Sequence, residues 1–236
     1  MASMQFDQHI SQGFNEELEQ VKTRMLEMGG SVHQQLQDAV KALEAADSAL
    51  AEHVVETEAE IDAAEMEIDE ACTLLIARRQ PTASDLRMVM AVSKAICDLE
   101  RIGDEAQRIA KMAINLCEQG GAPRGYMEIR HIANSVCDML NQALDAFARY
   151  DVDTALETLS ADKEVDMDYK SALREMITYM MEDPRSISRV MNIMWVLRSL
   201  ERAGDHAKNI CEQVVYLVKG KDIRHGHLDA VEEGEG

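Results

Sequence analysis

Four pairs of acidic residues are the side chains of this sequence best placed to do chemistry. The pairs are Glu58 with Asp62, Glu100 with Asp104, Asp162 with Asp166, and Glu201 with Asp205. Residues four apart lie about one turn from each other on the same face of a helix, so both carboxylates of a pair point the same way. Like charges at this spacing oppose helix formation by a few tenths of a kcal/mol, and a bound cation would remove that cost.

Carboxylates alone are ligands for hard or borderline metal ions, and two pairs on neighbouring helices would supply four of them to one site. The expected cofactors are therefore divalent or trivalent metal ions (Mg, Mn, Fe or Zn), with the identity left open. A solvated acidic face is the alternative, because the chain has 44 Asp and Glu against 24 Lys and Arg. Because the pairs recur at matched places in the sequence, they favour metal binding more strongly than a single pair would.

Catalytic motifs are missing from the sequence. The only E-x-x-H segment on an expected helix is Glu128 to His131, whereas a ferritin-like di-iron bundle needs that motif on two helices. There is no phosphate-binding loop of the G-x-x-x-x-G-K-[ST] type and no G-x-S-x-G nucleophile turn. We therefore predict no catalytic residues, no organic cofactor and no enzymatic activity.

The formal charge of -20 restricts the partners. A phosphate backbone or an anionic membrane surface would repel most of this molecule, which disfavours nucleic acid as a partner. Cations and basic protein surfaces are the partners that such a charge attracts, and a merely solvated acidic surface remains an equal alternative. No apolar run is long enough to span a bilayer, and the N-terminus lacks a signal-peptide pattern, so we expect a cytoplasmic protein without direct membrane insertion.

The elements that must position the acids are helices. Only three Pro interrupt a chain rich in helix-forming residues. Helical periodicity and turn signals predict an all-α fold of six long helices. The expected segments run from Asp7 to Ala46, from the Asp47-Ser48 cap to Arg79, from the Pro81–Ser84 turn to the Gly120–Gly125 loop, from Tyr126 to Arg149, from a cap at Asp151 or Asp153 to Asp183, and from the Asp183–Ser186 turn to Lys219.

An internal repeat divides these helices into two sets of three. The segment 100–104 (ERIGD) returns as 201–205 (ERAGD), and the acid pairs at 58–62 and 162–166 precede them in the same order. Pro81 and Pro184 stand between the acid pair and the ERxGD segment in their respective halves. This order predicts two tandem pseudo-symmetric three-helix bundles, at 1–120 and 121–219, and we expect an acidic, flexible tail at 220–236.

A helical wheel predicts how the third helix is oriented. Its solvent side is expected to carry Arg87, Lys94, Asp98, Arg101, Glu105 and Arg108. Glu100 and Asp104 then occupy a flank that a neighbouring helix can meet, and Arg101 is expected to pair with nearby acids such as Glu105. Gly103 and Gly204 predict close helix approach in both halves, because Gly inside a helix costs about 1 kcal/mol relative to Ala.

Taken together, these motifs resemble the PhoU family over essentially the whole chain. The resemblance rests on the duplicated ERxGD segments with their preceding acid pairs and Pro turns, and on the segments 6–10, 78–87 and 216–220. It implies paired three-helix bundles with metal ions at the acidic faces in some members. The implied sites are Glu58, Asp62, Glu100 and Asp104 in the first half, and Asp162, Asp166, Glu201 and Asp205 in the second.

The resemblance also implies a function in phosphate homeostasis. The expected role is negative regulation of phosphate uptake and of the phosphate-starvation response, as an adaptor between the ATPase subunit of the phosphate ABC transporter and the phosphate-sensing histidine kinase of a two-component system. A homodimer is expected. The alternative is a metal store or metal-dependent enzyme that uses the carboxylate faces. Asp162 stands where Glu58 does and His206 where Glu105 does, which leaves room for the two sites to differ in affinity or metal.

Overall fold

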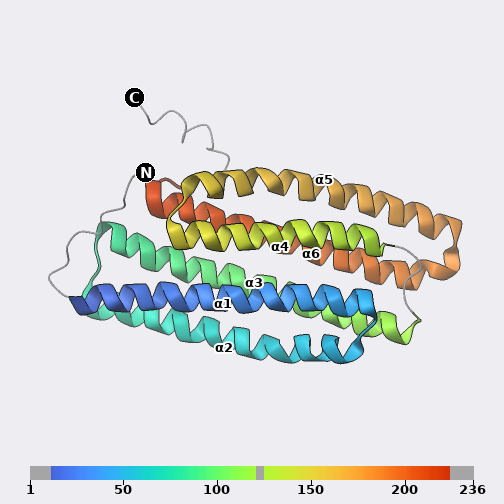
Figure 1. Cartoon of the computed structure of the whole chain (residues 1–236), viewed down its shortest axis with the longest axis horizontal. Helices are drawn as coiled ribbons and strands as arrows, with labels where there is room; N and C mark the ends of the chain where they lie inside the picture. The colour runs from blue at the N-terminus through green and yellow to red at the C-terminus, as the bar shows by residue number, and fades with distance from the viewer. Residues whose placement is uncertain (1–11, 121–124, 224–236) are drawn as a thin grey trace.

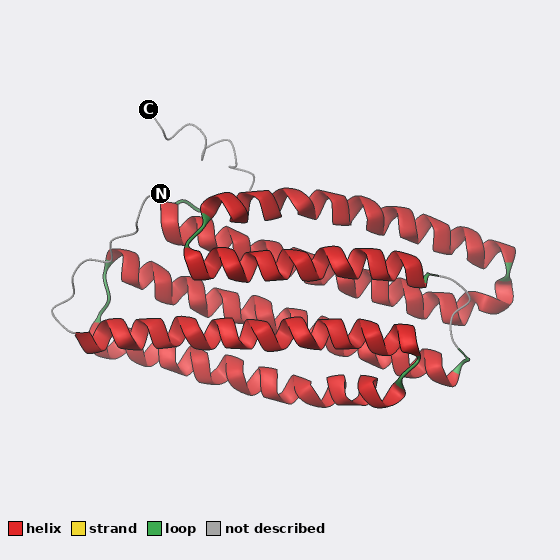
Figure 2. Cartoon of the chain, viewed as in Figure 1, coloured by secondary structure: helices red, strands yellow, loops and turns green. Residues whose placement is uncertain are grey.

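The computed structural model describes residues 12–120 and 125–223. Within these ranges it consists of six long helices and one short 3₁₀ turn, joined by short connections (Figures 1 and 2). The helices are α1 (Gln12–Ala45), α2 (Ser48–Arg79), α3 (Ala83–Glu118), α4 (Tyr126–Arg149), α5 (Val152–Glu182) and α6 (Ile187–Lys219), with the turn η1 (Pro184–Ser186) before the last. The prediction of an all-α fold with six long helices is confirmed. The start expected for the first helix, at Asp7, and the loop residues 121–124 lie outside the described residues.

Local sequence signals account for the helix boundaries. The Asp47 side chain caps α2 by accepting a hydrogen bond from the Leu50 N–H at 3.0 Å. Asp151, one of the two expected caps, accepts from the N–H groups of Asp153 and Thr154 at the start of α5. Gln80 and Gly220 take left-handed conformations directly after α2 and α6. These caps satisfy backbone groups that a helix end leaves without partners.

Each half is a group of three helices that pack against one another. Helices α1, α2 and α3 form the first group, and α4, α5 and α6 form the second, which lies beside it along the same long axis (Figure 1). The groups meet where α3 packs along α6 and where α1 packs against α4. Buried apolar side chains form one continuous core through both groups. The domain limits at 120 and 219 stay a prediction.

The shared interface changes the expected orientation of α3. Glu105 was expected on the solvent side, yet its side chain is only 2% exposed, and the Asp98 side chain is 16% exposed. Both residues face α6. The solvent prediction is therefore wrong for these two residues, because the second half covers part of the polar stripe of α3.

None of the helices in the described ranges contains a stretch that is both long enough and apolar enough to cross a membrane.

Candidate functional site

The first acid cluster brings together the two pairs of the first half, Glu58 and Asp62 on α2 with Glu100 and Asp104 on α3. Glu58 is 5% exposed, and its Oε2 accepts a hydrogen bond of 2.7 Å from Gln35 Nε2 on α1. Its other oxygen, Oε1, is buried and has no hydrogen-bond partner among the residues that the structure describes. Burial, opposed by the Gln35 hydrogen bond and reinforced by the other three acids, raises the pKa of Glu58 to about 7. The cluster therefore holds a buried carboxylate with only one of its two oxygens hydrogen-bonded among the described residues.

Gly103 on α3 makes room for this carboxylate. A Cβ atom at Gly103 would stand 3.2 Å from each Glu58 carboxylate oxygen and from Gln35 Oε1, which is tighter than an ordinary contact. Gly103 was predicted to permit close approach of a helix; the groups that approach it are the side chains of Glu58 and Gln35. A Cβ at Gly204 would meet Val136 and Val165 at 3.5 and 3.7 Å. That is ordinary contact, so packing does not require a glycine at position 204.

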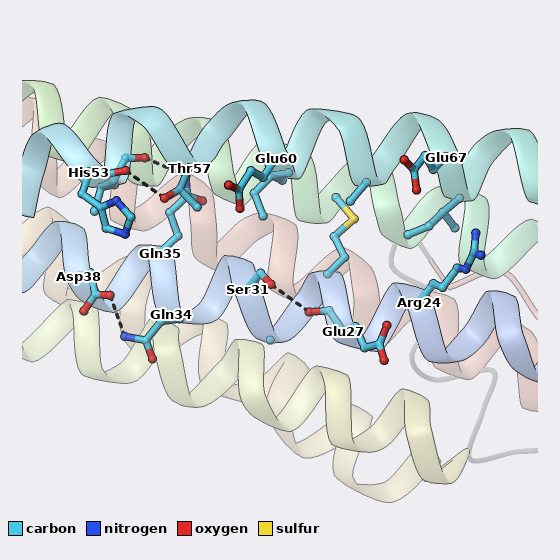
Figure 3. Close-up of a pocket in the computed structure, with 16 residues that line it drawn as sticks. Arg24, Glu27, Ser31, Gln34, Gln35, Asp38, His53, Thr57, Glu60 and Glu67 are labelled. Carbon is cyan, nitrogen blue, oxygen red and sulfur yellow. Dashed lines mark hydrogen bonds between the residues drawn. The ribbon is translucent and has the colours of Figure 1, made fainter.

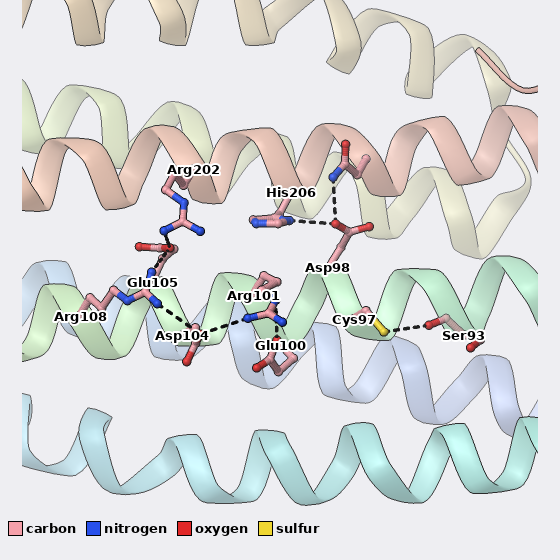
Figure 4. A network of polar contacts seen from close by, with 11 residues as sticks. Ser93, Cys97, Asp98, Glu100, Arg101, Asp104, Glu105, Arg108, Arg202 and His206 are labelled. Carbon is pink, nitrogen blue, oxygen red and sulfur yellow. Dashed lines mark hydrogen bonds and ion pairs between the residues drawn. The ribbon is translucent and has the colours of Figure 1, made fainter. Parts of the chain in front are cut away.

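Two arginines of α3 lie beside the exposed part of the first cluster. Arg101 contacts Glu100 at 3.3 Å and Asp104 at 3.7 Å, and Arg108 contacts Asp104 at 3.5 Å (Figure 4). Partial burial raises the pKa of Glu100, and Arg101 opposes that shift. The expectation that Arg101 pairs with nearby acids is confirmed, but Glu105 was the wrong example. Both acids lie on a flank of α3 whose neighbour is α2.

The second acid cluster differs from the first because it contains lysines. Asp162 on α5 is 8% exposed and accepts a hydrogen bond of 2.6 Å from Lys208 Nζ on α6. Asp166 accepts one of 2.9 Å from Lys170 Nζ on its own helix. Every acid of this cluster that lies on α5 thus has an ammonium partner.

Burial and mutual repulsion act on the α6 acids of the second cluster. Burial raises the pKa of Glu201, and Asp205 adds to the shift. Burial also raises the pKa of Asp205, with Asp162 adding to the shift and Lys208 opposing it. Repulsion therefore acts within this pair and across to α5, so the structure brings the predicted acids of the second half close enough to influence one another.

A preformed metal site is not present in the part of the chain that the structure describes. There, no group of three or more His, Cys, Asp or Glu side chains is gathered closely enough to hold a metal ion. The acids of each cluster instead lie within range of mutual repulsion. The metal prediction for all eight acids stays a prediction.

A surface groove between α1 and α2 lies beside the first acid cluster. The groove has a volume of about 860 Å³. Polar side chains dominate the part shown in Figure 3, among them His53 and Thr57 of α2 and Ser31 of α1. Gln35 lines the groove and also donates its hydrogen bond to Glu58. Through Gln35, the buried carboxylate is one side chain away from this groove.

Sequence patterns missed a polar network between the two halves. Asp98 Oδ1 on α3 lies 2.9 Å from His206 Nδ1 and accepts a hydrogen bond of 2.9 Å from Asn209 Nδ2, both on α6 (Figure 4). Glu105 Oε1 pairs with Arg202 Nη1 at 2.7 Å and also with Arg108. No pattern in the sequence indicated that Arg202 and His206 of the sixth helix bind α3. Lys208 was also missed, although aligning the repeats places it opposite Gln107.

Comparison with known proteins identifies the family that this chain resembles. Two segments of the chain, residues 25–113 and 129–214, match the PhoU domain. The chain is 58% identical over 225 residues to a phosphate-specific transport system accessory protein PhoU homolog of Pseudomonas aeruginosa, covering 95% of this chain and 93% of that protein. It is 46% identical to the phosphate-specific transport system accessory protein PhoU of Escherichia coli (strain K12), with the same coverage of both chains.

Solved structures with the same fold support the match. The crystal structure of PhoU from Pseudomonas aeruginosa superposes with a TM-score of 0.87 at 59% identity, covering 88% of this chain and all of that one. The phosphate transport system regulatory protein PhoU from Streptococcus pneumoniae superposes with a TM-score of 0.82 at 30% identity, covering 89% and 98% of the two chains. With both repeats matched and relatives aligned over nearly the full length, the chain belongs to the PhoU family.

Proposed function

We propose that the chain is a negative regulator of phosphate uptake and of the phosphate-starvation response, acting as an adaptor and not as an enzyme. The observation that carries this proposal is the near full-length similarity to accessory proteins of phosphate-specific transport systems. The proposed partners are the ATPase subunit of a phosphate ABC transporter and a phosphate-sensing histidine kinase. Both partners would be met in the cytoplasm by a homodimer of this chain.

An exposed apolar patch supports a role in binding proteins. Met181 on α5 is 79% exposed and Trp195 on α6 is 54% exposed, and three further exposed apolar side chains lie on the same two helices, which pack against each other. We call this set the hairpin patch; it consists of Ile177, Met181, Ile187, Met191 and Trp195. The spacing 187, 191, 195 places the α6 members on one stripe of the helix. Clustered exposed apolar residues of this kind are typical of protein interaction sites.

The corresponding part of the first half carries a smaller version of the patch. Leu74 and Leu86 are 39% and 38% exposed beside the α2–α3 connection, and Met90 is 39% exposed. Lys94 takes the place that Trp195 has in the second half, and its ammonium lies 5.1 Å from the centre of the Tyr216 ring. The second half therefore offers the larger apolar surface, and we assign partner binding to it.

The regulatory proposal is tested in a strain that lacks the gene for this chain. Phosphate-starvation genes should be derepressed at high phosphate, and a plasmid copy should restore repression. Unchanged reporter expression in the deletion strain would contradict the proposal. Pull-down with the transporter ATPase subunit and with the sensor part of the kinase then identifies which partner binds directly.

The hairpin patch is tested by matched substitutions. M181E should weaken capture of the partner and reduce repression, because it places a charge in the apolar surface that the partner would cover. M66E is the control, since Met66 is 65% exposed and lies on α2, in the first half of the chain. Equal capture by both variants would show that the hairpin patch does not contact the partner.

A metal ion is proposed as a modulator of this protein, not as a catalytic centre. The donor set fits a hard or borderline cation, because Glu58 has a buried oxygen without a partner and three further carboxylates lie near it. Glu58, Asp62, Glu100 and Asp104 would hold the ion, which would neutralise their mutual repulsion. Redox turnover or hydrolysis by the metal-loaded protein would instead favour the alternative, a metal-dependent enzyme.

A further inference from the structure

The two acid clusters occupy corresponding positions in the repeat but have different charges around them. In the second half, Lys208 Nζ on α6 lies 2.6 Å from Asp162 Oδ2 on α5. Burial opposes the charge of this ammonium, but Asp162 and Asp205 together raise the pKa of Lys208 above its ordinary value. One positive charge therefore interacts with acids on both helices of the cluster.

The first half has no lysine at the corresponding positions. Lys208 follows Asp205 by three residues, and the residue three after Asp104 is Gln107. Lys170 follows Asp166 by four residues, and the residue four after Asp62 is Met66, which is 65% exposed. Gln107 is neutral, and its Oε1 accepts a hydrogen bond of 2.5 Å from Lys111 Nζ one turn farther along α3.

The buried carboxylates of the two halves are consequently satisfied in different ways. Asp162 forms a partly buried ion pair with Lys208. Within the described ranges, Glu58 accepts a hydrogen bond only from the neutral amide of Gln35, and its Oε1 has no partner there. A buried, charged carboxylate without a positive partner lowers the stability of the fold. Breaking a buried ion pair is also costly in free energy, because one charge is then left buried without a partner.

Arg101 and Arg108 contact Glu100 and Asp104, but no ion pair of Glu58 is found among the described residues. An added cation would therefore gain more at the buried carboxylate of the first cluster than at that of the second.

We propose that Lys208 is a tethered cation that closes the second acid cluster, so that a divalent metal ion binds only at the first. The inference rests on the proposed binding of metal at the acid clusters. It assigns Lys208 as the residue that decides which half responds to metal, and it predicts that a neutral side chain there opens the second cluster. In the reverse direction, a lysine at position 107 would close the first.

The experiment is a titration of the full chain with Mn²⁺ in chelator-treated buffer, with free Mn²⁺ followed by its electron paramagnetic resonance signal. In an otherwise wild-type chain, the double substitution E100A/D104A should abolish Mn²⁺ binding, whereas E201A/D205A should leave it unchanged. K208Q should roughly double the bound Mn²⁺, and E201A/D205A added to K208Q should remove the gain. Q107K should abolish binding in an otherwise wild-type chain.

K208R is the matched control, because it keeps the positive charge and should bind as much Mn²⁺ as the wild type. Circular dichroism of each variant checks that its helices have formed, and the Mn²⁺-induced rise in Tm gives a second readout. Three results would each overturn the proposal. They are reduced Mn²⁺ binding when E201A/D205A is made in the wild-type chain, no increase in binding in K208Q, and no binding by the wild type. Failure here leaves the reporter test of the regulatory function intact, so the two are separable.

Discussion

Arg202 on α6 lies 2.7 Å from Glu105 on α3, and this ion pair joins the two halves of the repeat. The Glu105 side chain is 2% exposed and that of Arg202 is 41% exposed. Arg108 contacts the same carboxylate from within α3. The pair lies where α3 packs along α6, at a position that the helical wheel assigned to solvent. A buried carboxylate at this interface depends on arginines from both halves.

Removing Arg202 should therefore weaken the contact between the halves. We expect R202M to lower the free energy of unfolding by about 1 to 3 kcal/mol, because Glu105 stays buried with Arg108 as its only partner among the ion pairs described. Urea denaturation measures the loss, and the double variant E105Q/R202M should lose less than the sum of the single variants. R149M is the control. Arg149 pairs with Asp145 on an exposed face, and its loss should cost roughly 0.5 kcal/mol or less.

Glu58 should make the stability of the metal-free protein depend on pH. Its folded pKa is raised to about 7 from 4.5, so between these values the folded state binds more protons than the unfolded state. The contribution of Glu58 to the free energy of unfolding should therefore be greatest near and below pH 4.5. This contribution should fall by about 2 to 3 kcal/mol as the pH rises through 7.

The substitution E58Q tests this dependence, because an amide has no charge to lose or gain. Unfolding in urea with chelator present should show a smaller decrease between pH 5 and pH 8 in E58Q than in the wild type. E60Q, at an exposed position of the same helix, should keep the decrease. A wild-type slope that persists in E58Q would mean that other groups cause it.

The two helical glycines of the ERxGD segments should respond differently to alanine. G204A should stabilise the protein by about 0.5 to 1 kcal/mol, because Ala is the better helix former and its Cβ would meet Val136 at an ordinary 3.5 Å. G103A should gain less or destabilise, since its Cβ would press on the Glu58 carboxylate and on Gln35 at 3.2 Å. Chemical denaturation of both variants gives the comparison. Equal gains would show that the Glu58 side chain moves without cost.

The neighbouring glycines of α1 provide a test of the contact between α1 and α4. A Cβ at Gly29 would overlap with Leu144 Cδ2 of α4, whereas at Gly30 it would meet nothing within 4 Å among the described residues. G30A should raise the free energy of unfolding by about 0.5 to 1 kcal/mol. G29A should gain less, or lose stability, because Leu144 must shift. A gain in G29A equal to that in G30A would mean that Leu144 adapts freely.

The helices themselves, and their duplication, were readable from the sequence alone. Asp47 and Asp151 cap helices at the expected places, and the repeated acid pairs lie on facing helices in both halves. These features depend on hydrogen bonds and side-chain spacings between residues that are close together in the sequence. Family membership followed from the same motifs.

Only the tertiary structure decided which helix covers each face. A wheel places Asp98 and Glu105 on a polar stripe, but it cannot tell whether water or α6 lies against that stripe, because both satisfy charged groups. The same limit applies to Gln35 and Lys208, which reach Glu58 and Asp162 from other helices. Contacts between residues far apart in the chain depend on how whole helices pack, and this packing gave the first acid cluster an amide and the second an ammonium.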